Sequence, residues 1–319
     1  GLHGRARVVG HFHSEPDELF FGGRHRRRRL VGLQISDMAD RTHDGVSLAD
    51  GPFAQPDEER RFGGLARLYG TAGAARIRAA HVVVVGVGGV GSWAAEALAR
   101  SGVGRITLID MDHVAESNVN RQAHALTATL GQAKVQAMAE RMHGIHPMGQ
   151  VDAVDDFVTP ENWPALLPEG AQAVIDACDA YPAKLAMASW ALGQRGYPFI
   201  CVGAAGGKRE PWKTEVGDLV TVTHDPLLAK LRYRLRRELP GRRSGSHAHA
   251  QRPLGLSCVF SREAVARPQT EGEACAPSPG AALACAGYGS SVAVTASFGF
   301  AAAGWVMERL ARARDVSLR

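Results

Sequence analysis

The segment HVVVVGVGGVGSWAAEALARSGVGRITLID, residues 81–110, decides the fold. The apolar run 81–85 predicts a buried strand, and it leads directly into the glycine turn GVGGVG at 86–91. Ala and Leu then recur on one face of a predicted helix that stops at Gly102, and a second apolar strand ends at Asp110. A strand, a glycine turn, a helix and a further strand in this order predict a parallel unit that binds a nucleotide.

The rest of the chain continues this alternation. We expect helices at 59–80 (broken at glycines), 130–147 and 182–196, and strands at 150–157, 173–179 and 198–207. The pattern predicts an α/β protein with a Rossmann-like, doubly wound, mostly parallel sheet that helices cover on both faces. A C-terminal strand and helix extension should follow, with strand material at 213–223 that need not be parallel, a basic helix at 225–239, a strand at 256–265 and an apolar helix at 290–310.

The composition is ordinary for a soluble globular protein, with 45% hydrophobic and 22% charged residues and a net charge of +5. Five cysteines, an odd number without a C-x-x-C pair, argue against a disulfide scaffold and a four-cysteine zinc site. We therefore expect a reducing, cytoplasmic location. Residues 1–58 lack periodicity and are expected to be a disordered extension, unless the basic run at 25–29 makes them an arm that touches RNA.

The apolar segment 291–307 is close to the shortest length that spans a bilayer. Its many small residues favour a helix packed tightly against a sheet or a second copy of the chain. We therefore do not expect membrane association, although this helix is the segment that would provide it.

The glycine turn has the positions that a phosphate-binding loop needs. Gly86 permits the tight turn out of the strand, Gly88 and its neighbour Gly89 let the backbone approach a phosphate, and Gly91 lets the helix pack closely. Asp110, 19 residues after Gly91, stands where an acid holds a ribose hydroxyl. These features alone suit a dehydrogenase that binds NAD equally well.

The residues that follow Asp110 favour ATP over NAD or FAD. Asn118 and Arg121 come from the polar run SNVNRQ, and Lys134 begins the next helix. Arg121 and Lys134 are two cations placed to compensate a triphosphate and a departing pyrophosphate. Asp179, after a later buried strand, is placed where open sheets bind ligands and is a candidate ligand for Mg2+.

These motifs resemble the ubiquitin-activating-enzyme-like superfamily of adenylating enzymes. The match runs through GVGGVG, LIDMD, SNVNRQ, GQAK and VIDACD. Within the superfamily, RFGGLARLYG, DDFVTPEN, GAAGG, DPLLAKLR, CVFS and GYGSSVAVTASFGF are similar to the tRNA threonylcarbamoyladenosine dehydratases. The resemblance covers about residues 60–310, so we expect an adenylating domain over 59–312.

The resemblance implies a ligase-type reaction. Family members use ATP to activate the threonyl carboxylate of a modified adenosine beside the tRNA anticodon, and an intramolecular capture gives the cyclic product with net loss of water. The roles it implies are ribose binding by Asp110, phosphate binding by Asn118 and Arg121, stabilisation of transition-state charge by Lys134, and Mg2+ binding by Asp179. It also implies a homodimer in which Arg67 reaches the ATP site of the partner subunit.

Two other functions remain open on the sequence. The first is an adenylating activator of a ubiquitin-like sulfur-carrier protein, although the two C-x-x-C pairs that usually hold zinc in that group are absent here. The second is a noncatalytic nucleotide-binding scaffold in a sulfur relay, which would bind a sulfur-relay protein partner. The front extension and the loop 241–252 also look longer than the family pattern requires.

Four features have competing interpretations. Asp112 is either a second acid of the pocket or a helix-capping residue, and Asp176 is expected to be structural, which leaves Asp179 for the metal. Cys258 is expected to be a buried small side chain rather than a nucleophile. Between Lys230 and Arg252 there are eight Lys and Arg residues and one acid, which indicates either a solvated face or a surface for tRNA phosphates. For the second interpretation the expected contacts are Arg232, Arg234, Arg236 and Arg237.

Overall fold

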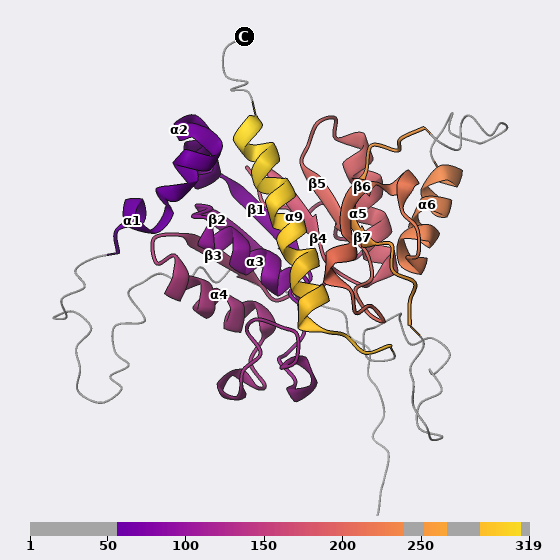
Figure 1. Cartoon of the computed structure of the whole chain (residues 1–319), viewed down its shortest axis with the longest axis horizontal. Helices are drawn as coiled ribbons and strands as arrows, with labels where there is room; N and C mark the ends of the chain where they lie inside the picture. The colour runs from indigo at the N-terminus through magenta and orange to yellow at the C-terminus, as the bar shows by residue number, and fades with distance from the viewer. Residues whose placement is uncertain (1–55, 239–251, 267–287, 314–319) are drawn as a thin grey trace, which may run out of the picture.

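A computed structural model of the protein describes residues 56–238, 252–266 and 288–313. Their centre is a seven-stranded sheet in the order β3-β2-β1-β4-β5-β7-β6 (Figure 1). The strands are β1 (His81–Val85), β2 (Arg105–Ile109), β3 (Gln150–Val154), β4 (Ala173–Asp176), β5 (Phe199–Val202), β6 (Thr214–Asp218) and β7 (Ser257–Ser261). Every neighbouring pair is parallel except β6 and β7. The predicted mostly parallel sheet is therefore confirmed, and the two later strands extend this same sheet.

The helices occupy the predicted stretches, with ends that differ by a few residues. They are α1 (Glu58–Phe62), α2 (Gly64–Ala79), α3 (Gly91–Arg100), α4 (Lys134–Ile145), α5 (Tyr181–Gly193), α6 (Pro226–Glu238) and α9 (Val292–Arg312). The expected glycine breaks in the first segment are present, because Gly63 separates α1 from α2 and Gly70 has a left-handed φ of 74° inside α2. The 1–55 part of the expected extension and residues 241–251 of the basic loop lie outside the described residues.

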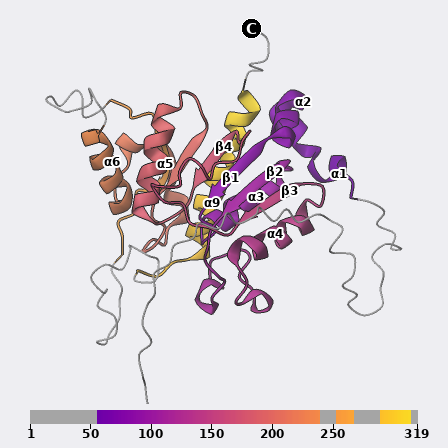
Figure 2. The ribbon, with the colours of Figure 1, turned by 180° about the vertical axis from the view of Figure 1, so that it is seen from behind.

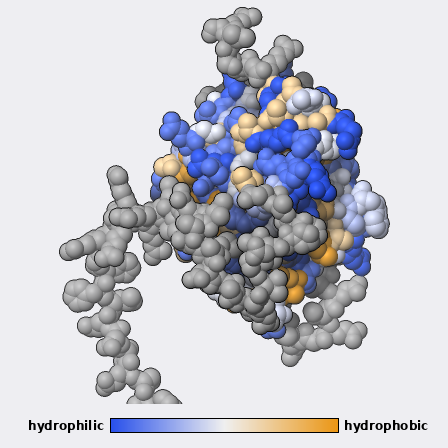
Figure 3. Space-filling model, turned by 90° about the vertical axis from the view of Figure 1, so that its left-hand side faces the viewer, coloured by the Kyte–Doolittle hydropathy of each residue, from blue (hydrophilic) through white to orange (hydrophobic). Residues whose placement is uncertain are grey.

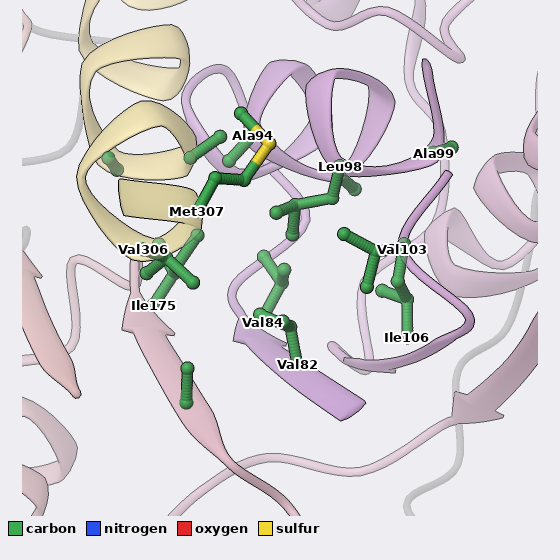
Figure 4. Packing of buried hydrophobic residues seen from close by; sticks show 14 of the residues in the cluster. Val82, Val84, Ala94, Leu98, Ala99, Val103, Ile106, Ile175, Val306 and Met307 are labelled. Carbon is green, nitrogen blue, oxygen red and sulfur yellow. The ribbon is translucent and has the colours of Figure 1, made fainter. Parts of the chain in front are cut away.

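The side chains of β1 alternate between two cores. Val82 and Val84 pack with α3, α4 and α9, whereas Val83 and Val85 pack with α5 and α6 on the opposite face. Figure 4 shows the first core, where β1 and β4 meet α3 and α9. Seen from behind in Figure 2, α5 and α6 lie together on their own side of the sheet. The expected covering of the sheet by helices on both faces is thus present.

The apolar C-terminal helix is explained by close packing. An added Cβ at Gly299 of α9 would lie 2.6 Å from the carbonyl oxygen of Val90, so glycine is required where α9 crosses the start of α3. The expectation that this helix is buried against the sheet is confirmed. Within the described residues, no helix has both the length and the hydropathy needed to cross a bilayer.

Figure 3 shows that the side of the molecule on which α1, α2 and α4 lie is largely hydrophilic, with small hydrophobic areas.

Candidate nucleotide-binding site

A pocket of about 310 Å3 opens at the carboxyl ends of the central strands. The chain places β2 and β3 on one side of β1 and then crosses to β4 on the other side, so the strand order reverses beside β1. Such a reversal leaves a crevice where ligands bind in open parallel sheets. The residues predicted from sequence that line this pocket are Gly86, Gly88, Gly89, Asp110, Asp112, Asn118, Arg121, Lys134 and Asp179.

The glycine turn is closed tightly on one side and open on the other. Gly86 has a φ of 83°, and a Cβ there would lie 2.8 Å from the backbone of Cys178. A Cβ at Gly91 would lie 1.8 Å from the carbonyl oxygen of Gly86. Glycine is therefore needed here chiefly for the tight turn between β1 and α3, rather than for the helix packing that we predicted. A Cβ at Gly88 would meet nothing within 4 Å, which leaves room for a phosphate.

The turn also offers hydrogen-bond donors. Among the described residues, the amide groups of Gly88, Gly89 and Val90 donate to no other group, and they precede the first turn of α3. Unpaired amides at the start of a helix, where the helix dipole is positive, attract anions. This part of the pocket therefore fits the phosphates of a nucleotide.

Asp110 and Asp112 have different environments although they are two residues apart. The carboxylate of Asp110 is buried and accepts hydrogen bonds from the amides of Val87 (2.6 Å) and Asp112 (2.8 Å). Burial raises the pKa of Asp110, although the nearby Lys134 ammonium opposes this shift. The side chain of Asp112 is 56% exposed and pairs with Lys134 Nζ at 2.6 Å. Asp112 is therefore a pocket acid, and no side chain caps the start of α4.

The polar run after β2 is held by its own hydrogen bonds. Asn118 Oδ1 accepts from the amide of Ala115 at 3.0 Å, which fixes the short turn that carries it. Arg121 Nη1 donates to the carbonyl of Ser117 at 2.7 Å, and the stem of Arg121 lies against Gly89. The guanidinium thus stands at the pocket with its position already fixed.

The two acids near the end of β4 have different environments. Asp176 is fully buried and forms an ion pair of 2.8 Å with Lys184 Nζ, which is fully buried too. Asp179 is exposed in the following turn and lines the pocket. Among the described residues, no group of three or more His, Cys, Asp or Glu side chains is placed to hold a metal. A metal at Asp179 would therefore take most of its ligands from phosphate oxygens and water, as Mg2+ commonly does.

Lys184 was not recognised from the sequence. Its ammonium also donates to the carbonyl of Val202 at 3.0 Å, so it links the end of β4 to the end of β5. Burial alone would lower the pKa of Lys184, but the adjacent Asp176 carboxylate outweighs burial and the pKa is raised. The two strand ends that Lys184 joins lead into the pocket walls at 177–180 and 203–206.

Arg67 lies away from the pocket of its own chain. It is exposed on α2, and α2 packs through Gly73 against Ala311 near the end of α9, whereas Thr295 at the start of α9 lines the pocket (Figure 1). Ala311 follows Thr295 by 16 positions, which correspond to about 24 Å of helix. Arg67 is not among the residues that line the pocket of its own chain.

Several pocket residues were missed by sequence reasoning. They are Asp156, Phe157, Cys178, Gly203–Gly206, Leu227 and Thr295. Most belong to segments, such as GAAGG and GYGSSVAVT, whose resemblance to the family could have pointed to the pocket, but the resemblance gave no role for individual residues.

Cys258 is fully buried in β7, which supports the expectation of a packing role.

The comparisons with known proteins agree with the motifs. A model of the ThiF family matches residues 62–312. The chain is 44% identical over 256 residues to the tRNA threonylcarbamoyladenosine dehydratase of Escherichia coli, covering 79% of this chain and 93% of the relative, and 40% identical over 259 residues to that of Haemophilus influenzae, covering 81% and 95%.

A solved structure supports the same relationship. The E. coli tRNA N6-threonylcarbamoyladenosine dehydratase in complex with ATP superposes with a TM-score of 0.69 at 41% identity, covering 81% of this chain and 97% of that chain. The resemblance to the dehydratases that the motifs predicted is confirmed. This chain belongs to the ThiF family.

Proposed function

We propose that this protein is an ATP-dependent tRNA threonylcarbamoyladenosine dehydratase. The observation that carries the proposal is that the similarity to the E. coli dehydratase covers 93% of that relative, while the family match over residues 62–312 includes every residue that lines the pocket. The substrate would be tRNA whose adenosine beside the anticodon carries the threonylcarbamoyl group. The product would be the cyclic nucleoside, with one water lost.

The pocket suits adenylation of a carboxylate. A carboxylate is a poor electrophile because its leaving group would be oxide, and transfer of AMP to it supplies a better leaving group. The amides of the glycine turn bind phosphate, while Arg121 and Lys134 stabilise the negative charge that develops as pyrophosphate departs. The substrate provides its own nucleophile for ring closure, so no nucleophilic side chain is required of the protein.

Mg2+ fits the same pocket as a second component. Asp179 would hold it together with phosphate oxygens, and the ion would neutralise part of the triphosphate charge. Asp112 lines the same pocket and is already paired with Lys134, so it would reduce the positive charge that the pocket presents to the phosphates.

We further propose a cytoplasmic homodimer. The exposed position of Arg67, remote from its own pocket, supports a role at the pocket of a second copy. An RNA substrate supports a location in the cytoplasm. A sulfur-relay protein partner remains a proposal on the family resemblance, and none of the described contacts bears on it.

The function is tested by incubating the protein with ATP, Mg2+ and tRNA that carries threonylcarbamoyladenosine. Nucleosides prepared under mild conditions are then examined by mass spectrometry. Loss of one water is expected, and Lys134→Ala and Arg121→Ala should each reduce its rate by about 100-fold or more. Arg195→Ala, which removes an exposed cation beyond the far end of α5, is the matched control and should retain the wild-type rate. No change of mass in a protein that binds ATP would refute the proposal.

A further inference from the structure

A second cleft lies beside the nucleotide pocket, between α5 and α6. We call it the α5–α6 cleft; it has a volume of about 480 Å3, and its lining includes Pro160, Tyr181, Lys230, Tyr233 and Arg234. Its lining combines two tyrosines with two cations. No step in the proposed adenylation uses these side chains.

The α5–α6 cleft adjoins the nucleotide pocket along three segments. Ala180 lines the pocket, and the next residue, Tyr181, lines the cleft. On α6, Leu227 lines the pocket and Lys230 lines the cleft one turn later. Phe157 lines the pocket, and the same segment reaches the cleft at Pro160. A chain that enters the pocket through this side would therefore pass over the cleft.

The aromatic rings of the cleft are presented together with cations. Tyr233 is 63% exposed, and the Arg237 guanidinium lies 5.5 Å from its ring centroid. Lys230 Nζ lies 4.0 Å from the centroid of the Tyr181 ring. Arg234 pairs with Glu238 on the same helix, and both side chains are substantially exposed. An exposed ring flanked by cations is the arrangement that binds unpaired nucleotides, because bases stack on the ring while the cations contact phosphates.

The arginines of α6 do not all share this surface. Arg232 Nη1 donates to the carbonyls of Leu219 (3.0 Å) and Val222 (2.7 Å), so its guanidinium stabilises the protein's own loop. We therefore assign Arg232 a structural role, in place of the contact with tRNA that we expected from the sequence. Lys230, Tyr233 and Arg234 line the cleft itself. Arg236 and Arg237, two of the other predicted contacts, line the adjoining surface of α6 together with Tyr233 and Arg234.

We propose that the α5–α6 cleft binds the single-stranded nucleotides that flank the modified adenosine in the anticodon loop. Bases stack on Tyr233 and Tyr181, and Lys230, Arg234 and Arg237 contact the phosphates between them. The proposal rests on the proposed function, because that function places the modified adenosine at the adjoining pocket.

The test compares Tyr233→Ala with Tyr233→Phe, which keeps the ring. Binding of an anticodon stem-loop RNA is measured by fluorescence anisotropy, and the KM values for tRNA and ATP are measured with the whole protein. Tyr233→Ala should weaken RNA binding and raise the KM for tRNA by about 5-fold or more, with kcat and the KM for ATP unchanged. Tyr233→Phe should behave as wild type. Trp212→Ala, which removes another exposed aromatic side chain, should also leave RNA binding unchanged.

A second variant tests the phosphate contacts. Lys230→Ala should reduce the slope of log affinity against log salt concentration by about 0.7, the value for one contact to a single strand. Arg195→Ala removes the same charge beyond the other end of α5 and should leave the slope unchanged.

The outcomes distinguish the RNA-binding role of the cleft from the proposed dehydratase reaction. If wild type binds the stem-loop without dehydrating tRNA, and Tyr233→Ala weakens that binding, the cleft assignment stands and the proposed function fails. If Tyr233→Ala and Lys230→Ala bind RNA as wild type does, the cleft assignment is overturned, even in an active dehydratase. The surface would then be better assigned to a protein partner.

Discussion

Individual side chains in the pocket are held before any nucleotide arrives. Asp110 accepts two backbone amides, Asn118 fixes its own turn, and Arg121 donates to a neighbouring carbonyl. The residue types and their spacing were enough to select these positions from the sequence. Their partners were not predictable, because the pairing of Lys134 with Asp112 depends on how the loop after β2 folds back on the start of α4.

His124 is a buried side chain with a predictable effect on stability. It is 1% exposed, and neither ring nitrogen has a hydrogen-bond partner among the described residues. Burial, followed by the positive charges of Lys134 and Arg141, lowers the pKa of His124 to about 4. The unfolded chain, with a histidine pKa of about 6.5, binds a proton first as the pH falls. The contribution of His124 to stability is therefore present above pH 6.5 and is lost as the pH falls from about 6.5 to 4.

This loss should amount to about 2 kcal/mol in the free energy of unfolding between pH 7 and pH 5. The measurement is urea unfolding of wild type and of His124→Gln at both pH values. The variant should lose about 2 kcal/mol less than wild type over this interval, because glutamine does not titrate. An equal loss in the two proteins would show that His124 is not held neutral in the folded state.

Among the helices and strands, those with a clear periodicity were predicted well. The run 81–85 became β1, and Lys134 begins α4 as expected. The position of β7 between β5 and β6 was not predicted, because it depends on pairing between strands that are distant in sequence. The bond network of Lys184 was missed for the same reason. A lysine among alanines on a predicted helix is ordinarily solvated, whereas here it joins β4 to β5.

The junction between β4, α5 and β5 should depend on this buried ion pair. Lys184→Met leaves the Asp176 carboxylate buried without its partner, and we expect it to lower the free energy of unfolding by about 3–5 kcal/mol. The double variant Lys184→Met with Asp176→Leu should recover more than half of that loss, because a buried pair is replaced by apolar side chains. Chemical denaturation of wild type, the single variant and the double variant measures these free energies of unfolding. A single variant as stable as wild type would contradict the account.

In the whole molecule, the order of the strands determines where the pocket lies. The surfaces around the pocket are those we propose for tRNA and for a second subunit. The pocket lies at the reversal beside β1, the α5–α6 cleft adjoins it, and α2, the helix that carries Arg67, lies beside the far end of α9 (Figure 1). The nucleotide loop was recognisable from sequence because its glycines and cations are close in the chain. The cleft was not, because Tyr181 and Tyr233 come from separate helices.

The position of Arg67 predicts complementation between subunits. In a homodimer where each site uses its own Lys134 and the partner's Arg67, Arg67→Ala and Lys134→Ala are each inactive alone. Dimers that combine one subunit of each type contain one intact site out of two. After unfolding and refolding of an equal mixture, half of the dimers are mixed, so about a quarter of wild-type activity should return. A mixture that stays inactive, while refolded wild type recovers, would remove Arg67 from the partner's site.

Adenylation of the threonyl carboxylate is the central claim, and oxygen transfer tests it most directly. The carboxylate of threonylcarbamoyladenosine in tRNA is labelled with 18O, and the nucleotide products of a reaction with unlabelled ATP are examined by mass spectrometry. The account predicts one AMP for each cyclised nucleoside, with one labelled oxygen in each AMP, because ring closure breaks the bond between the acyl carbon and that oxygen. Cyclisation accompanied by ADP and phosphate, or by AMP without label, would contradict it.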